Sequence, residues 1–380
     1  PPGGGGGGKK KAAAAKEEAP AAAAELVGAP LRESEMAKVT KDGTTHLAFQ
    51  PRSDSLIVAA GDKKGYVGLW DVGAADDATD GVRLLSPHEQ YISGLAWEGR
   101  SGGARLFTAS YDGSVRRLDV GQGGGAVWEL AHGDPNGEES SAMCDGTDGR
   151  LWLATNDGDL CAVDARAPSM SVGLLSVHEQ KVNTVSVSPG REWLLATAAS
   201  ECGAQGAATT VRVWDVRKLE DKAESASLKA KGPAHAGKPL HFLPHGRSCQ
   251  AAYWAPDGSD RLLTTSWDCA LRVWDGVGAA SGKAPEITAP ARKITHDTAT
   301  GRWIIPFRAI WTAAADGVVV GSMAKGARRA TLYDAKSGKK LHDFIEPELL
   351  SAIPSRCAAH PTLPAIAAAT SSGRIHVFRK

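Results

Sequence analysis

The side chains that look most able to do chemistry are three metal-ligand types in one short segment, His241, His245 and Cys249. Three residues separate each from the next, so a helix would bring all three to one face. Pro244 and Gly246 interrupt any helix there, and the segment lacks a closed four-ligand set. The sequence therefore predicts no metal site.

Motifs of known catalytic and cofactor-binding loops are also missing. We find no phosphate-binding P-loop, no GxSxG nucleophile elbow, no HExxH and no dinucleotide fingerprint. The sequence predicts a binding protein with no cofactor and no small-molecule substrate. An enzyme with its site on loops is the least favoured alternative.

Histidine and aspartate nevertheless recur at fixed places. His88 and His178 each begin a His-Glu-Gln triplet, and Asp112 lies at an Asp-Gly turn six residues before Leu118. A carboxylate at such a turn accepts hydrogen bonds from backbone N–H groups and from a nearby histidine, as buried polar groups require. We interpret these residues as structural and not as catalytic.

These turns belong to an internal repeat. Six β-rich runs end in an apolar residue followed by Asp71, Asp119, Asp164, Asp215, Asp275 and Asp334. Successive aspartates lie 48, 45, 51, 60 and 59 residues apart, which suits a repeat of about 40–45 residues with four strands per blade and loop insertions. Residues 375–378 form a seventh run. The predicted fold is an all-β, seven-bladed WD-repeat β-propeller.

A ring of blades must be closed to remove its sheet edges. The last repeat ends after its third strand, and residues 36–41 precede the first full repeat, so they are predicted to supply the missing fourth strand. Residues 1–35 are rich in Gly, Ala, Pro, Lys and Glu, and we expect a low-complexity, disordered tail. The propeller is assigned to residues 36–380. Lys9, Lys10 and Lys11 fit a solvated charge run better than a nuclear-import signal.

Composition limits the partners and the compartment. The net charge is +1, so any basic surface must be local. The six cysteines lie far apart without a CxxC pair, which favours reduced thiols in the cytosol or nucleus. No apolar run approaches the ~20 residues of a membrane span. The chain begins with Pro1 in place of Met, which we interpret as a truncated N-terminus.

The turns between second and third strands carry cationic and aromatic residues where Asp-Gly is usual. They include Lys63, Lys64, Tyr111, Trp267, Lys325 and Arg328, and Arg116 follows one of them. Because the repeat phase places these turns on one face, the set has the composition of a nucleic-acid surface. The alternative for each Lys or Arg alone is a solvated charge.

Several blocks go beyond a generic repeat. They are residues 56–71, 110–116, 266–268 and, most specifically, 296–311. Together they resemble the WD repeat-containing protein 76 family and its fungal damaged-DNA-binding WD-repeat counterpart over residues 36–380. The resemblance implies a nuclear propeller that binds DNA or chromatin. By likeness to a more distant ultraviolet-damage-binding relative, Arg302, Trp303 and Arg308 would contact DNA; the alternative is that Trp303 packs between blades.

The opposite face has its own signal. Asp164-Ala165-Arg166 and Asp215-Val216-Arg217 end the third strands of consecutive repeats. Such Asp-x-Arg boxes resemble those of propellers that serve as substrate receptors of cullin–RING ubiquitin ligases, in which the arginine contacts the adaptor. A guanidinium suits a bidentate interface contact. The alternative is a corner salt bridge within the propeller.

The sequence thus supports a nuclear propeller in the DNA damage response. We expect it to bind double- or single-stranded DNA, damaged or modified, and hypothesise that it is the substrate receptor of a cullin–RING ligase. The alternative from another class is a protein-only chromatin scaffold that reads histone tails or other peptides.

Overall fold

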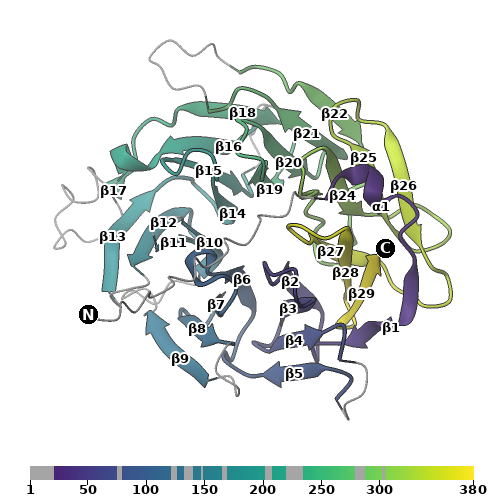
Figure 1. Cartoon of the computed structure of the whole chain (residues 1–380). Coiled ribbons are helices and arrows are strands. Elements are labelled where there is room, and N and C mark those ends of the chain that lie inside the picture. Colours follow the sequence, from purple (N-terminus) through teal and green to yellow (C-terminus); the bar gives the residue numbers. More distant parts are fainter. Residues whose placement is uncertain are drawn as a thin grey trace, which may run out of the picture.

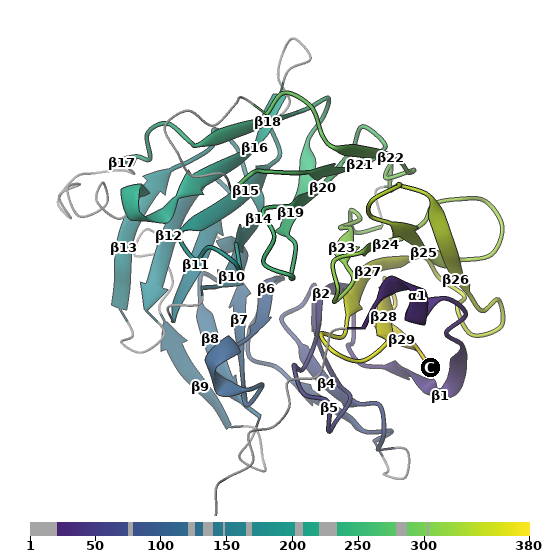
Figure 2. The same cartoon turned by 45° about the horizontal axis from the view of Figure 1, so that its top comes forward.

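Seven β-sheets arranged around one axis form the computed structural model of this chain (Figure 1). The structure describes residues 21–74, 79–120, 126–131, 140–146, 149–164, 169–201, 208–219, 234–278, 287–301 and 304–380. Apart from two added outer strands described below, the strands of each sheet form an antiparallel meander that runs in chain order from the centre outward, as Figure 2 also shows. The predicted seven-bladed propeller is confirmed.

The first four blades follow chain order. Blade 1 is β2 (Thr44–Phe49), β3 (Ile57–Asp62), β4 (Val67–Asp71) and β5 (Val82–Leu85). Blade 2 is β6 (Ile92–Trp97), β7 (Arg105–Ser110), β8 (Val115–Asp119) and β9 (Ala126–Ala131). Blade 3 is β10 (Ser140–Asp145), β11 (Arg150–Thr155), β12 (Asp159–Asp164) and β13 (Ser169–Ser176), with the short β17 (Ala234–His235) added in parallel. Blade 4 is β14 (Val182–Val187), β15 (Leu194–Ala199), β16 (Ala208–Asp215) and β18 (His241–His245).

The last three blades complete the ring. Blade 5 is β19 (Cys249–Trp254), β20 (Leu262–Ser266), β21 (Ala270–Trp274) and β22 (Arg292–Thr295). Blade 6 is β23 (Ile310–Trp311), β24 (Gly317–Gly321), β25 (Arg329–Asp334) and β26 (Lys340–Ile345). Blade 7 is β27 (Pro354–Ala359), β28 (Ala365–Thr370), β29 (Arg374–Arg379) and β1 (Leu31–Lys38). A 3-10 turn, η1 (Gly99–Ser101), lies in blade 2.

The N-terminal strand closes the ring. β1 pairs antiparallel with β29, and Met36 faces His376 in the register. The predicted closure is therefore confirmed, but β1 begins at Leu31 and the short helix α1 (Ala23–Leu26) precedes it. The described fold thus starts ahead of the expected boundary at residue 36. The reason is burial: Leu31 and Glu35 are almost inaccessible to solvent within blade 7, although the polar residues 32–34 between them are exposed.

Apolar residues of facing blades form the core between sheets. Trp70, Trp152, Trp214 and Trp274 are all buried there, as expected for a repeat that hides one large side chain per blade. Among the described residues no helix is long and apolar enough to cross a membrane.

Hydrogen-bonded histidines tie successive blades together, as the repeat pattern predicted. His178 Nε2 lies 2.7 Å from Thr197 Oγ1, which accepts the Trp214 Nε1–H at 2.9 Å. His88 lies 3.0 Å from the Asp112 carboxylate and 2.9 Å from Thr108. These histidines are structural.

The segment with three metal-ligand types has the same role. His245 Nε2 lies 2.8 Å from Thr264 Oγ1, and Cys249 Sγ donates to the backbone oxygens of Ala251 and Thr265. His241 and His245 lie on β18, whereas Cys249 begins β19. Within the described residues no group of three His, Cys, Asp or Glu side chains is arranged to hold a metal ion.

Candidate nucleic-acid interface

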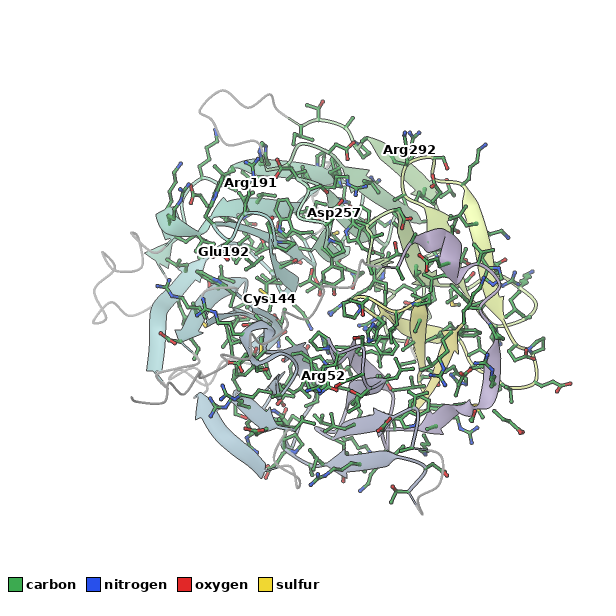
Figure 3. All side chains as sticks on the ribbon, viewed as in Figure 1. Arg52, Cys144, Arg191, Glu192, Asp257 and Arg292 are labelled. Carbon is green, nitrogen blue, oxygen red and sulfur yellow. The ribbon has the colours of Figure 1, made fainter. Side chains whose placement is uncertain are left out.

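Strand direction defines two faces of the disc. The upper face carries the turns between second and third strands and the links to the next blade, and the lower face carries the other turns. Hydrogen bonds between these turns and these links support the assignment. Tyr111 N and Trp267 N, in second-to-third-strand turns, donate to Tyr91 O and Ser248 O, in links between blades. In Figure 3 the labelled Arg52, Arg191 and Asp257 lie in first-to-second-strand turns and so belong to the lower face.

The turns predicted to bind nucleic acid come together on the upper face. Lys63 and Lys64 lie between β3 and β4, Tyr111 between β7 and β8, Trp267 between β20 and β21, and Lys325 and Arg328 between β24 and β25. Trp267 is 40% exposed, and the Lys64 side chain is 69% exposed. Lys325 and Arg328 are also exposed. Among these turns, three blades thus present an exposed cation or aromatic ring on one side, and Tyr111 of a fourth blade is half-buried.

Local hydrogen bonds explain why the β3–β4 turn presents its lysines outward. The buried Asp62 carboxylate accepts from the backbone N–H groups of Lys64 at 2.8 Å and Tyr66 at 3.0 Å. Gly65 has φ +86°, and a Cβ there would lie 2.2 Å from the His88 carbonyl oxygen. The Asp62 carboxylate and the close approach of the His88 backbone to Gly65 therefore set the conformation of this turn. A further cation, Lys41, lies 4.1 Å from the centre of the Tyr66 ring.

Tyr111 lies in a small cationic cluster with Tyr91 and Lys181. The two tyrosine rings are 4.9 Å apart at 30°. Lys181 Nζ donates to Tyr111 Oη and lies 5.0 Å from its ring centre. Tyr91 and Lys181 were not predicted, yet each directly follows a His-Glu-Gln triplet. Including the residue after each triplet in the repeat pattern would have identified both as candidates.

Arg116 differs from the expectation. Its guanidinium donates to the Pro87 carbonyl oxygen. Arg212, at the corresponding place in β16, donates likewise to Val177 and pairs with Glu201 at 3.2 Å. The repeated geometry shows that this position stabilises the link between blades, and it leaves Arg116 only partly exposed.

Arg308 also lies elsewhere than expected. Its Nη2 donates to the Asn183 carbonyl oxygen at 2.8 Å, and its Nη1 donates to His46 Nε2 at 3.1 Å. Arg308 therefore lines the central cavity and not the outer surface. Arg302 and Trp303 lie outside the described residues. Gly301, which precedes them, is exposed.

On the lower face, Arg217 makes a bidentate pair with Asp215 of its own Asp-x-Arg box. Nε donates to Oδ1 at 2.9 Å and Nη2 to Oδ2 at 2.8 Å. Hydrogen bonding from Arg217 lowers the pKa of the Asp215 carboxyl. The guanidinium also lies 4.5 Å from the centre of the Trp193 ring.

This internal pair is the alternative that the sequence left open, but it does not hide the side chain. The Arg217 side chain remains 63% exposed, and its pair with Asp215 holds it in one orientation. In the companion box, Asp164 ends β12 and Arg166 lies outside the described residues.

Comparisons with known proteins agree with this architecture. The family model described as "WD domain, G-beta repeat" matches residues 169–215 and 237–275. The chain is 34% identical over 351 residues to WD repeat-containing protein 76 of Xenopus laevis, which covers 92% of this chain and 55% of that protein. The protein of the same name from Mus musculus is 32% identical over 358 residues, covering 93% of this chain and 52% of that protein.

A fungal relative carries a functional name. DNA damage-binding protein CMR1 of Meyerozyma guilliermondii is 27% identical over 375 residues, covering 90% of this chain and 62% of that protein. The chain thus spans between about half and two thirds of the length of these curated relatives. The resemblance expected from the residues is confirmed: the chain is a WD-repeat propeller, homologous over most of its length to WD repeat-containing protein 76 and to the fungal CMR1 proteins.

Proposed function

We propose that this propeller binds DNA through its upper face in the nucleus, in a damage-related role, and that it acts by binding and not by catalysis. One observation carries the proposal: turns from three blades present Lys63, Lys64, Trp267, Lys325 and Arg328 on the same side. Lysine and arginine supply the phosphate contacts that dominate affinity for DNA. The exposed Trp267 ring is suited to stack on an unpaired base. The name of the fungal relatives supports this assignment.

The test is a titration of labelled duplex at several salt concentrations. In the Lys63→Ala, Lys64→Ala double variant, two phosphate contacts are lost. The slope of log K against log salt should therefore become shallower by about 2. The matched control is Lys336→Ala with Lys339→Ala, two exposed lysines between β25 and β26 on the lower face. Equal slopes for both double variants and wild type would remove the upper face from the proposal.

The lower face supports a second role, as the docking surface for a cullin–RING ligase adaptor. The observation that favours it is Arg217, which Asp215 and Trp193 hold in place while most of its side chain stays exposed. A pre-positioned guanidinium loses little conformational entropy when it binds a partner.

Arg217→Ala should abolish co-purification of the adaptor and leave binding of duplex DNA unchanged. The buried Asp215 carboxylate keeps the backbone N–H of residue 217 as a donor at 3.2 Å, so the variant should remain folded, which circular dichroism checks. The control is Arg292→Ala on β22, whose guanidinium donates to the Lys336 carbonyl oxygen. Undiminished recovery of the adaptor with Arg217→Ala would refute this role.

A further inference from the structure

The propeller has a central cavity of about 570 Å³. The first strands of all seven blades line it: β2, β6, β10, β14, β19, β23 and β27. Much of the wall is apolar, with Met143, Tyr253 and Trp311 among its residues. Two arginines, Arg308 and Arg356, lie in the same wall. Their charges need an explanation, because a cavity of this kind is a poor place for an unpaired cation.

Arg356 is only 5% exposed and reaches the cavity from β27. Its Nε donates to Thr45 O at 2.6 Å, and its Nη1 donates to the carbonyl oxygens of Pro306 and Ser355. Within the described residues, Nη2 has no hydrogen-bond partner, and no ion pair includes Arg356 or Arg308. Both guanidinium groups are thus held by neutral carbonyl oxygens and by a histidine.

The charges of the two arginines affect the titratable groups around them. His46 Nδ1 donates to Ile92 O at 3.1 Å while Nε2 accepts from Arg308, so the ring is neutral in this geometry. Burial, Arg308 and Arg356 together hold the pKa of His46 well below its usual value, and Lys181 adds to the effect. Burial and the charge of Arg308 lower the pKa of Arg356 to about 9.

A carboxylate does occur in the wall, but at the far end. Asp145 is the last residue of β10, near the lower face, and it accepts from Gly99 N at 2.9 Å. The arginines lie toward the upper end, since Arg356 is the third residue of β27 and Arg308 precedes β23. The cavity therefore has a cationic upper half without a counter-charge among the described lining residues.

We infer that this upper half of the central cavity binds a carboxylate carried by an acidic peptide segment of a partner protein. Two guanidinium groups are suited to grip a single oxyanion by charge-assisted hydrogen bonds. The apolar wall fits the aliphatic part of a glutamate side chain or an adjacent residue. Peptide is favoured over duplex DNA because Arg356 is almost fully buried within the ring of strands, where the phosphates on the outside of a double helix cannot reach.

The same charge argues against a basic peptide here. A lysine- or arginine-rich tail would bring a further cation against Arg308 and Arg356, which like-charge repulsion disfavours. For the alternative of a protein-only scaffold, this argues against a basic tail in the cavity. A partner segment that enters the cavity should carry Asp or Glu.

The test uses a fluorescein-labelled, glutamate-rich peptide with the full chain, and a matched peptide with Gln for every Glu. Wild-type protein should bind the Glu peptide and not the Gln peptide. Arg308→Met, which removes one guanidinium while keeping the aliphatic stem, should weaken binding about tenfold or more, the effect of losing a hydrogen bond to a charged group. Equal affinity for both peptides, or no loss in the variant, would overturn the inference.

Thermal unfolding without ligand provides a second measurement. If the arginine pair is kept for a ligand, Arg308→Met relieves repulsion on Arg356 and should raise the midpoint temperature or leave it unchanged. The Glu peptide should raise the midpoint of wild type only. A variant that is destabilised, together with a wild type that ignores the peptide, would show a purely structural arginine and end the proposal.

Two outcomes separate this site from the proposed DNA surface. Arg308→Met should leave duplex binding intact, whereas the Lys63, Lys64 double variant should keep its affinity for the Glu peptide. If a short single-stranded DNA displaces the Glu peptide and fails to bind Arg308→Met, the cavity is a nucleic-acid site and the acidic-peptide inference is wrong.

Discussion

Single carboxylates decide whether the upper turns hold their shape. Asp112 accepts from His88 Nδ1 at 3.0 Å, from Ser114 N at 2.9 Å and from Glu89 N at 3.2 Å. Burial raises the pKa of the Asp112 carboxyl, but the hydrogen bonds from His88 and Ser114 outweigh it and hold the pKa well below its usual range. The ionised form therefore stabilises the fold, and Tyr111 is carried by the same turn.

Asp112→Asn should lower the free energy of unfolding by about 1–2 kcal/mol at pH 7, because charge-assisted hydrogen bonds are lost. A carboxyl whose folded pKa is depressed stabilises the protein fully above its unfolded pKa of about 4, and this contribution is lost as the pH falls from there through the folded pKa. The gap between wild type and variant should therefore begin to narrow below about pH 5 and should still be narrowing at about pH 3, because the folded pKa lies lower. Urea titrations at several pH values measure it.

The control for this pH dependence is Asp275→Asn, at an exposed aspartate directly after β21. It should change the free energy of unfolding little at any pH, as surface substitutions do. A gap for Asp112→Asn that is the same at pH 7 and pH 3 would contradict the assigned role of its charge.

At the scale of strands, the repeat pattern located the elements well. Asp71, Asp119, Asp164, Asp215 and Asp334 each end a third strand, as the apolar-Asp pattern predicted. The same phase explains why Lys64, Tyr111 and Trp267 share a face. Phase is a local property, because alternation and turn residues are encoded within each run of the chain.

Features that depend on distant neighbours could not be predicted. Leu31 begins β1 because β29 offers it a partner 347 residues away, Phe378. Arg308 precedes a first strand of only two residues, β23, and turns inward to the Asn183 carbonyl oxygen of blade 4. Local alternation carries no information about such contacts. For the same reason Arg308 was expected on the surface, and the charge of the central cavity was missed.

At the scale of the whole molecule, one strand keeps the ring closed. Blades 1 to 6 take their four main strands in chain order, with β17 added at the outer edge of blade 3, whereas blade 7 combines β1 with β27, β28 and β29 (Figure 1). An open repeat array tolerates fraying at its ends, but in a ring the release of β1 exposes the edge of β29 and loosens both neighbouring blades. A small change in β1 should therefore affect the stability of the entire propeller.

Glu35 is the residue at which this coupling is best tested. It is fully buried, and its carboxylate accepts from Arg379 Nε on β29 and from Arg32 Nη1, each at 2.6 Å. Glu35→Ala leaves Arg379 without this partner, and since both arginines are partly exposed we expect a loss of about 1–3 kcal/mol, below the usual cost of breaking a buried pair. Thermal unfolding should show a single transition at lower temperature, and proteolysis should cut first near β1.

Glu33→Ala, an exposed glutamate on the same strand, should behave like wild type. If Glu35→Ala melts no earlier than Glu33→Ala, closure by β1 does not control the stability of the ring.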